Sequence, residues 1–195
     1  MRYDSSHPLP LLLLLTFQLL SCQEDATTAP ELEESGIGSG TWRVPLEVTP
    51  GRYYTDPSSG CYFERLSGFG GALEDIIANE FIGFDPGQWI VDISASDVGF
   101  STTSACGRWR QERQIGLRST ISPGTWEVRS QVAPGRYRAN ATEGCYWARL
   151  SSFGANFSGI LANGFNSNAG PAIVDILPSD VGFSSNDSCG TWAQI

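Results

Sequence analysis

A tandem duplication constrains the fold of this chain more than any other feature of its sequence. Residues 40–109 align with residues 124–192 over almost their whole length. The shared runs are Pro-Gly-Arg-Tyr, Gly-Cys-Tyr, Arg-Leu-Ser, Ile-Val-Asp-Ile and Ser-Asp-Val-Gly-Phe-Ser. Repeats of this length are typically complete small domains rather than turns of a solenoid. We therefore expect two copies of one small domain in tandem.

Each copy carries two cysteines, one in Gly-Cys-Tyr and one in Cys-Gly-x-Trp. The simplest connectivity keeps both bridges within a copy and joins Cys61 to Cys106 and Cys145 to Cys189. A small domain has a small core, and closing a loop of this length stabilises it by up to ~4 kcal/mol. Zinc is the alternative use of such cysteines, but the single histidine, His7, lies in the amino-terminal leader.

Short β-prone runs alternate with glycine and proline along each copy, which predicts an all-β fold. In the second copy we expect strands at 125–132, 136–139, 145–151, 172–177 and 183–192, with a turn or short strand within 152–164. The predicted architecture is therefore two tandem small disulfide-stapled β-sandwich or barrel domains. They follow a signal peptide and a flexible tether.

The first 21 residues contain an apolar run at residues 8–20, which is too short to span ~30 Å of hydrocarbon. The run ends in Leu-Leu-Ser-Cys22, which resembles the lipobox that closes the signal peptide of a bacterial lipoprotein. The resemblance implies cleavage before Cys22 and acylation of that cysteine. The protein would then be lipid-anchored on the extracytoplasmic face of the bacterial cell envelope, at the outer membrane or cell surface. An ordinary secretory signal, which would leave Cys22 as a free thiol, is the alternative.

Two segments lie outside the repeats. Residues 22–39 are acidic and lack aromatic side chains, so they are expected to form a flexible tether. Residues 110–123 separate domain 40–109 from domain 124–195 and contain Arg110, Arg113 and Arg118. This segment is interpreted as a solvated linker, or alternatively as a cationic strap against the more acidic first copy.

The composition excludes several kinds of chemistry. With one histidine in the leader and no lysine, the chain lacks a Ser-His-Asp site, a Cys-His site and a Schiff-base lysine. A net charge of -9 argues against a nucleic-acid partner. Only carboxylate chemistry remains, as paired acids for glycoside cleavage or as calcium ligands. We expect no catalytic activity, no cofactor and no metal, with a carboxylate-dependent hydrolase as the weakest alternative.

The acids and arginines shared by both copies are interpreted as structural. Asp92 and Asp175 interrupt apolar strands, where a charge is costly unless it is paired. The shared arginines are their expected partners, which predicts the ion pairs Arg65–Asp92 and Arg149–Asp175. Asp97 and Asp180 are expected to bond local backbone amides in turns, with calcium binding as the alternative.

Aromatic side chains are the candidate binding groups, because Tyr and Trp offer a flat apolar face with a polar tip. Tyr62 and Tyr146 are expected on the strand face opposite the cysteines, and Trp147 follows Tyr146. Phe81, Phe84 and Trp89 lie in the most variable part of the first copy and could form an exposed edge.

The motif series Pro-Gly-x-Tyr, Gly-Cys-Tyr-[Trp/Phe]-x-Arg-Leu, Ser-Asp-x-x-Phe and Cys-Gly-x-Trp resembles a small repeat of exported and lipid-anchored bacterial proteins. The resemblance implies an extracytoplasmic β-domain and carries no known reaction or ligand. We expect a non-catalytic module that binds a cell-wall glycan or an envelope protein, with the membrane as a partner through Cys22. A purely structural envelope protein is the alternative.

Overall fold

The computed structural model describes residues 36–83, 87–111 and 116–195. Cys22, residues 23–35 of the expected tether, Phe84 and Arg113 lie outside these ranges. Residues 36–39, which were expected to belong to the tether, are part of repeat one, because Ile37 is buried in its core and bridges Trp109. The helices of the described chain are short 3₁₀ turns at η1 (Leu73–Asp75), η2 (Ser104–Cys106), η3 (Phe157–Gly159) and η4 (Asp187–Cys189). None of the described helices has the length and apolar character needed to cross a bilayer.

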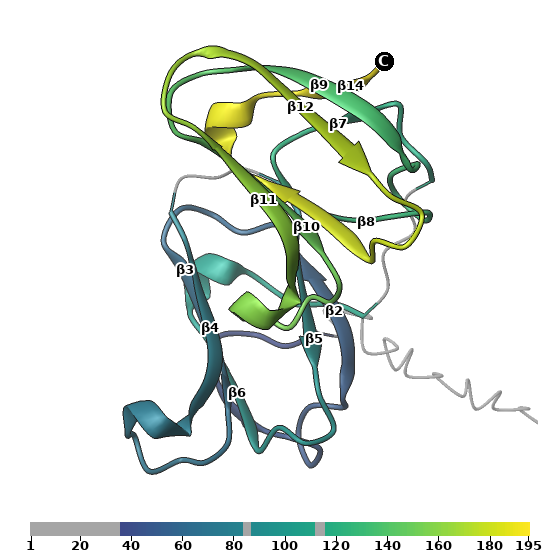
Figure 1. Cartoon of the computed structure of the whole chain (residues 1–195). Helices are drawn as coiled ribbons and strands as arrows, with labels where there is room; N and C mark the ends of the chain where they lie inside the picture. The colour runs from purple at the N-terminus through teal and green to yellow at the C-terminus, as the bar shows by residue number, and fades with distance from the viewer. Residues whose placement is uncertain (1–35, 84–86, 112–115) are drawn as a thin grey trace, which may run out of the picture. The chain divides into compact units, whose positions relative to one another are not determined.

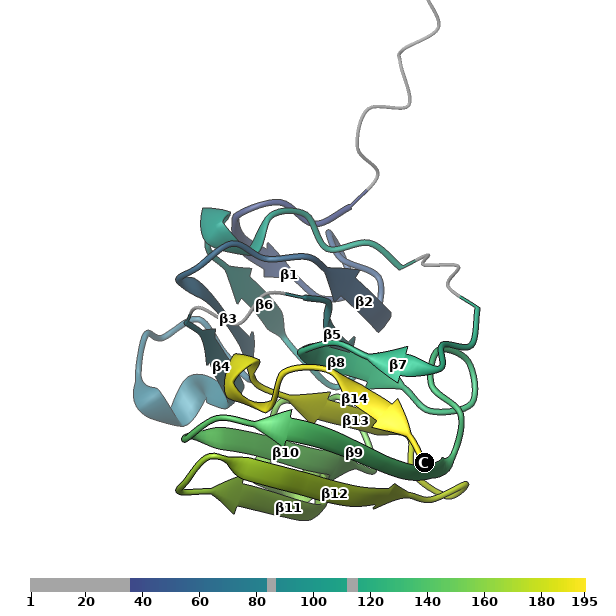
Figure 2. The ribbon, with the colours of Figure 1, turned by 90° about the horizontal axis from the view of Figure 1, so that it is seen from above.

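Repeat two, residues 116–195, is a sandwich of two four-stranded antiparallel sheets (Figures 1 and 2). One sheet has the order β11-β10-β13-β8 and the other β12-β9-β14-β7. The strands are β7 (Thr120–Ile121), β8 (Gly124–Glu127), β9 (Gly135–Ala141), β10 (Cys145–Leu150), β11 (Ile160–Asn166), β12 (Gly170–Ile176), β13 (Gly182–Ser185) and β14 (Trp192–Gln194). Buried side chains from both sheets form one core between them.

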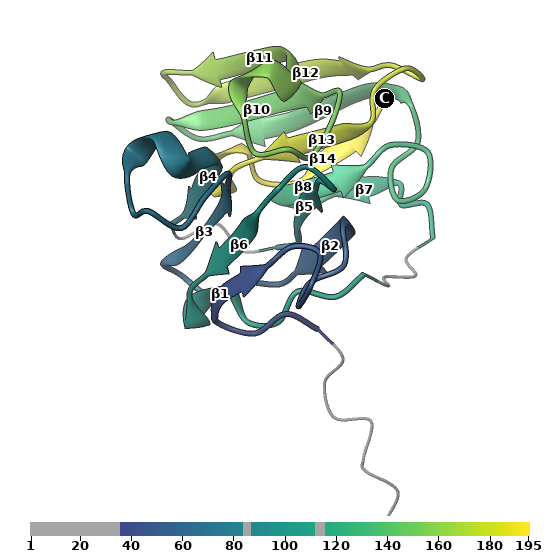
Figure 3. The ribbon, with the colours of Figure 1, turned by 90° about the horizontal axis from the view of Figure 1, so that it is seen from below.

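Repeat one, residues 36–111, has a similar arrangement with less regular outer strands (Figure 3). Its sheets have the orders β1-β6-β3-β4 and β2-β5. The strands are β1 (Gly40–Arg43), β2 (Gly51–Thr55), β3 (Cys61–Leu66), β4 (Ile76–Ile82), β5 (Trp89–Ile93) and β6 (Gly99–Thr102). Where repeat two has the strands β7 and β14, repeat one has only isolated bridges, from Ile37 to Trp109 and from Tyr54 to Arg110. The predicted pair of all-β domains is confirmed.

The Cys-Gly-x-Trp motif closes each core in the same way. The disulfides join Cys61 to Cys106 and Cys145 to Cys189, as predicted. The glycine after each second cysteine has a left-handed backbone, with φ of 68° in repeat one and 64° in repeat two, which a residue with a Cβ rarely adopts. This turn directs Trp109 and Trp192 into the cores, where both are fully buried.

The predicted ion pairs have the wrong partners. Asp92 pairs with Arg52 of β2, with 2.7 Å between Oδ1 and Nε, because these two residues lie directly across the β2–β5 ladder. Asp175 pairs with Arg136 of β9 at 2.7 Å for the same reason. Arg65 and Arg149 therefore do not pair with Asp92 and Asp175.

The shared arginines of β3 and β10 bind the turn aspartates instead. Arg65 binds Asp97 and Arg149 binds Asp180, each with 2.7 Å between Nε and Oδ2. As predicted, both aspartates also accept local backbone amides. The Ser94 amide lies 2.9 Å from Asp97, and the Leu177 amide lies 2.8 Å from Asp180. Each carboxylate is almost fully buried and fixes a loop to a strand.

Three expected segments of repeat two differ from the structure. Residues 152–164 contain η3 and the seven-residue strand β11 rather than a turn or short strand. The expected strand 183–192 is divided by η4, which brings Cys189 to its partner. The expected strand 125–132 ends at Glu127. The strand β7 lies in the segment interpreted as a linker, where Arg118 stacks 4.6 Å above the Trp126 ring of repeat two.

We expect Asp97→Asn to destabilise the protein by ~3–5 kcal/mol, because the substitution leaves the buried Arg65 guanidinium without its counter-ion. Urea unfolding with the disulfides intact measures this change. Asp175→Asn is the matched control. It breaks an ion pair that is about half exposed to solvent, so it should change the unfolding free energy little. Equal losses in the two variants would contradict the assigned pairing.

Candidate functional site

A loop of repeat two inserts into repeat one. We call it the Phe153 loop (residues 152–156). The Asp92 amide donates to the Phe153 carbonyl at 2.9 Å, and the Phe153 amide donates to the Asp92 carboxylate at 3.2 Å. The Arg65 guanidinium donates to the Gly154 carbonyl at 2.9 Å. The Arg52 guanidinium lies 4.4 Å from the centre of the Phe153 ring. Both repeats belong to one compact unit of the chain.

Apolar packing accompanies these polar contacts. The Phe153 side chain is 2 % exposed and clusters with Tyr54 and Ile90 of repeat one. Burial of a phenylalanine side chain contributes ~1.5–3 kcal/mol. Ala155 packs against the core of repeat one although its φ is 55°, a conformation that disfavours a Cβ. The counterpart of Ala155 in repeat one is Gly71, with φ of 77°. Ala155 therefore combines a strained backbone conformation with a methyl contact between the repeats.

A second group of contacts joins β5 to β8. The Thr125 amide donates to the Gln88 carbonyl at 2.7 Å. The side chains of Gln88 and Gln131 are buried and bond each other twice, at 2.8 and 3.1 Å. Glu127 accepts from Arg52 at 2.5 Å and from the Tyr54 hydroxyl at 2.8 Å. The two repeats are thus held by buried polar groups with defined partners.

The contacts at this junction shift the pKa values of Arg52, Tyr54 and Glu127. Burial alone would raise the pKa of Glu127, but hydrogen bonds donated by Ser130, Arg52 and Tyr54 outweigh it and lower that pKa. Burial alone would lower the pKa of the Arg52 guanidinium, while its bonds to Asp92 and Glu127 raise it. Burial and the bond to Glu127 both raise the pKa of the Tyr54 hydroxyl. Glu127 therefore acts at the junction as a carboxylate.

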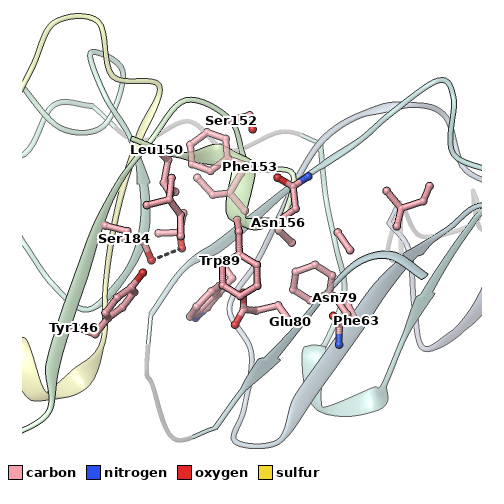
Figure 4. Close-up of a pocket in the computed structure, with 18 residues that line it drawn as sticks. Phe63, Asn79, Glu80, Trp89, Tyr146, Leu150, Ser152, Phe153, Asn156 and Ser184 are labelled. Atoms are coloured by element: carbon pink, nitrogen blue, oxygen red, sulfur yellow. Dashed lines mark hydrogen bonds between the residues drawn. The ribbon is translucent and has the colours of Figure 1, made fainter. Parts of the chain in front are cut away.

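A cleft of about 480 Å³ opens beside the Phe153 loop, between the β10 face of repeat two and strands β4 and β5 of repeat one (Figure 4). We call it the inter-repeat cleft. Its lining is mainly apolar and aromatic, with a few amide, hydroxyl and carboxylate groups. The lining includes Ile77, Asn79, Glu80, Trp89, Tyr146, Leu150, Phe153, Asn156, Phe157 and Ser184. Such a mixture is typical of small-molecule sites.

The family model of the Rv1352-like extracellular domain matches residues 34–110 and 118–193. The chain belongs to this family. No curated protein matches the chain. The match supports an exported protein and places one extracellular domain on each repeat. The second matched segment begins before β7, in agreement with the strand pairing of β7 to β14.

The two family domains place the candidate tyrosines at equivalent positions with different surroundings. The Tyr62 hydroxyl donates to Glu64 at 2.8 Å. Ala148 of β10 stands where β3 has Glu64, so the Tyr146 hydroxyl lacks that acceptor. Both hydroxyls accept weakly from a neighbouring asparagine at 3.4 Å. Of the two tyrosines, Tyr146 lines the inter-repeat cleft.

The other aromatic candidates divide between core and cleft. Trp147 packs into the core of repeat two, 6.5 Å from Phe183 and from Trp192 between ring centres. Its ring is partly buried against that core and does not line the inter-repeat cleft. Trp89 lines the cleft, and its buried Nε1 donor has no partner among the described residues. Phe81 is 64 % exposed, consistent with the expected edge.

Sequence reasoning missed the residues that join the two extracellular domains. The junction uses Tyr54, Gln88 and Glu127, whose counterparts in the other copy are Arg138, Pro171 and Arg43. The cleft likewise uses Trp89 and Glu80, which correspond to Ala172 and Gly164. A comparison of the two copies for their differences, rather than their identities, would have found these positions. No cluster of three or more His, Cys, Asp or Glu side chains in the described ranges is arranged to hold a metal ion.

Protonation of the Glu127 carboxylate in acid should weaken the junction. Because folding lowers the pKa of this carboxylate from 4.5, its stabilising contribution is present above pH 4.5 and is lost as the pH falls through the folded value. Glu127→Gln should cost ~1–2 kcal/mol near neutral pH, and the difference from the wild type should shrink below pH 4.5. Urea unfolding across this pH range is the measurement. Glu143→Gln in the β9–β10 turn controls for the loss of one charge. A pH-independent difference for Glu127→Gln would reject the role.

Proposed function

We propose that this protein is a non-catalytic binding module of the bacterial cell envelope whose ligand occupies the inter-repeat cleft. The observation that supports this proposal most is the meeting of Trp89 from repeat one and Tyr146 from repeat two in one cleft (Figure 4). Neither domain alone provides this pair. An exported, extracytoplasmic protein of this family would meet cell-wall and envelope components.

A glycan fits the chemistry of the cleft best. Trp and Tyr rings offer flat apolar faces against which the C–H face of a sugar ring can stack. The amides of Asn79 and Asn156 and the carboxylate of Glu80 line the same cleft. These groups can bond hydroxyls and N-acetyl groups at the ring edge. The Tyr146 hydroxyl, which lacks the counterpart of Glu64 that Tyr62 bonds, adds a donor.

The number of carboxylates in the cleft lining favours binding over hydrolysis. Hydrolysis of a glycosidic bond normally needs two acids on either side of that bond. The described lining of the cleft contains one carboxylate, that of Glu80. We therefore propose recognition without cleavage, and without a cofactor.

A second candidate is docking of an envelope protein on exposed apolar rows. Leu73, Ile77 and Phe81 in repeat one correspond in sequence to Phe157, Leu161 and Phe165 in repeat two. All six are at least 39 % exposed. Exposed apolar groups that gather on a surface often mark interaction sites. A purely structural protein remains the alternative, and it predicts a surface without a large contiguous apolar patch.

We expect Trp89→Ala and Tyr146→Ala each to weaken binding of soluble peptidoglycan fragments by tenfold or more, because each removes a stacking face from the cleft. Titration calorimetry with the purified chain measures the affinity. Tyr62→Ala is the matched control, since it removes the equivalent tyrosine outside the cleft. Absence of binding by the wild type, or equal losses in all three variants, would reject the glycan site.

Membrane attachment through Cys22 belongs to the same proposal and rests on the lipobox resemblance. Acyl chains contribute ~0.8 kcal/mol per buried methylene, so several chains give stable anchoring. Mass spectrometry of the membrane fraction should find a mature chain that begins at an acylated Cys22, and Cys22→Ser should release the protein from that fraction. An unmodified Cys22 in a soluble wild-type chain would contradict the anchor.

A further inference from the structure

The contact between the repeats uses one loop and one acceptor site, and the duplication supplies a second copy of each. The acceptor site of repeat one consists of Arg52, Arg65, Ile90 and Asp92, which hold the Phe153 loop. Its counterpart in repeat two consists of Arg136, Arg149, Ile173 and Asp175. The counterpart of the Phe153 loop is the Phe69 loop (residues 68–72). The residues that make the backbone and aromatic contacts are thus present twice.

The second loop and the second acceptor are both exposed. Phe69 is 51 % exposed, whereas Phe153 is 2 % exposed. Ile173 is 53 % exposed, whereas Ile90 is 4 % exposed. The chain therefore displays an unused loop on repeat one and an unused acceptor on repeat two.

The Phe69 loop already has the conformation that docks. Its ring lies over Gly99 in the same way that the Phe153 ring lies over Gly182, so close that neither glycine could carry a Cβ. Gly71 takes the left-handed conformation of Ala155. Docking would therefore need little ordering of the loop, which lowers its entropic cost.

The acceptor of repeat two is similarly formed. Arg136 and Asp175 pair across β9 and β12 as Arg52 and Asp92 pair across β2 and β5. Arg149 is held by Asp180 through Nε and Nη2, as Arg65 is held by Asp97. In repeat one, this arrangement directs Arg65 Nη1 to the loop carbonyl.

We propose that the Phe69 loop of one molecule docks into the acceptor site of repeat two of a second copy, so that copies associate head to tail. Such a contact joins different surfaces of the two molecules, and it therefore produces open chains or closed rings rather than a symmetric dimer. Each new contact would repeat, between two molecules, the docking of a loop into its acceptor site that lies beside the inter-repeat cleft within one molecule.

Charge makes this contact weaker than the one within the chain. Arg43 stands at the position of Glu127, and it would face Arg136 and Arg138 of the second copy instead of Arg52 and Tyr54. Asp75 favours the contact, because its carboxylate lies against Gly70 and has a buried oxygen without a partner among the described residues. Arg149 would approach that position. Association should therefore depend on concentration, and Arg43→Glu should strengthen it.

Sedimentation of the full chain at increasing concentration tests the proposal. The wild type should form dimers and larger species, and Arg43→Glu should do so at concentrations about tenfold lower. Phe69→Ala and Ile173→Glu should each remain monomeric, because one lacks the loop and the other the acceptor. Phe81→Ala, which removes another exposed ring outside both sites, should behave like the wild type.

An equimolar mixture of Phe69→Ala and Ile173→Glu tests whether association uses this contact rather than a different surface. Each variant retains the half that the other lacks, so the mixture should form dimers and nothing larger. A wild type that stays monomeric up to its solubility limit would overturn the proposal. So would variants that associate normally by themselves, or a mixture that stays monomeric.

Discussion

The Phe153 loop and the Arg52–Asp92 pair that receives it are the contact on which the arrangement of this protein depends. Each extracellular domain has its own core, disulfide and buried arginine–aspartate pair. The hydrogen bonds use backbone groups of the Phe153 loop, and the buried Phe153 ring contacts Arg52 and clusters with Tyr54 and Ile90. Backbone bonds fix orientation while the ring supplies apolar burial. Together with the Gln88–Gln131 pair, they hold Trp89 and Tyr146 across one cleft.

The duplication places two copies of one small domain side by side, and the copies differ where they meet. Identities between the copies lie in the features that every copy needs, such as the Cys-Gly-x-Trp closure and the arginine that holds the turn aspartate. Differences lie where the copies meet. Glu127 for Arg43 and Tyr54 for Arg138 give the inner junction charge complementarity that the outer surfaces lack. Ala155 for Gly71 adds a methyl group to the core of repeat one at the expense of backbone strain.

The fold could be predicted from the sequence because its main determinants are local or duplicated. Cysteine positions within each copy identified the disulfides, and glycine and proline spacing identified the all-β class, although it missed β7 and the full length of β11. The partners of Asp92 and Asp175 could not be predicted, because spacing along the chain does not show which strands lie side by side. The Phe153 loop could not be predicted for another reason. Its Phe-Gly pair is identical to Phe69-Gly70, and only the tertiary contact distinguishes a buried copy from an exposed one.

The amides of Asp92 and Asp175 provide the most direct test of this account. They occupy equivalent places in β5 and β12, but the Asp92 amide is bonded to the Phe153 carbonyl. Hydrogen exchange measured by NMR on dilute protein should show strong protection at Asp92 and much faster exchange at Asp175. Phe153→Ala should reduce the protection at Asp92 and leave Asp175 unchanged. Equal exchange at the two amides in the wild type would contradict the insertion of the Phe153 loop into repeat one.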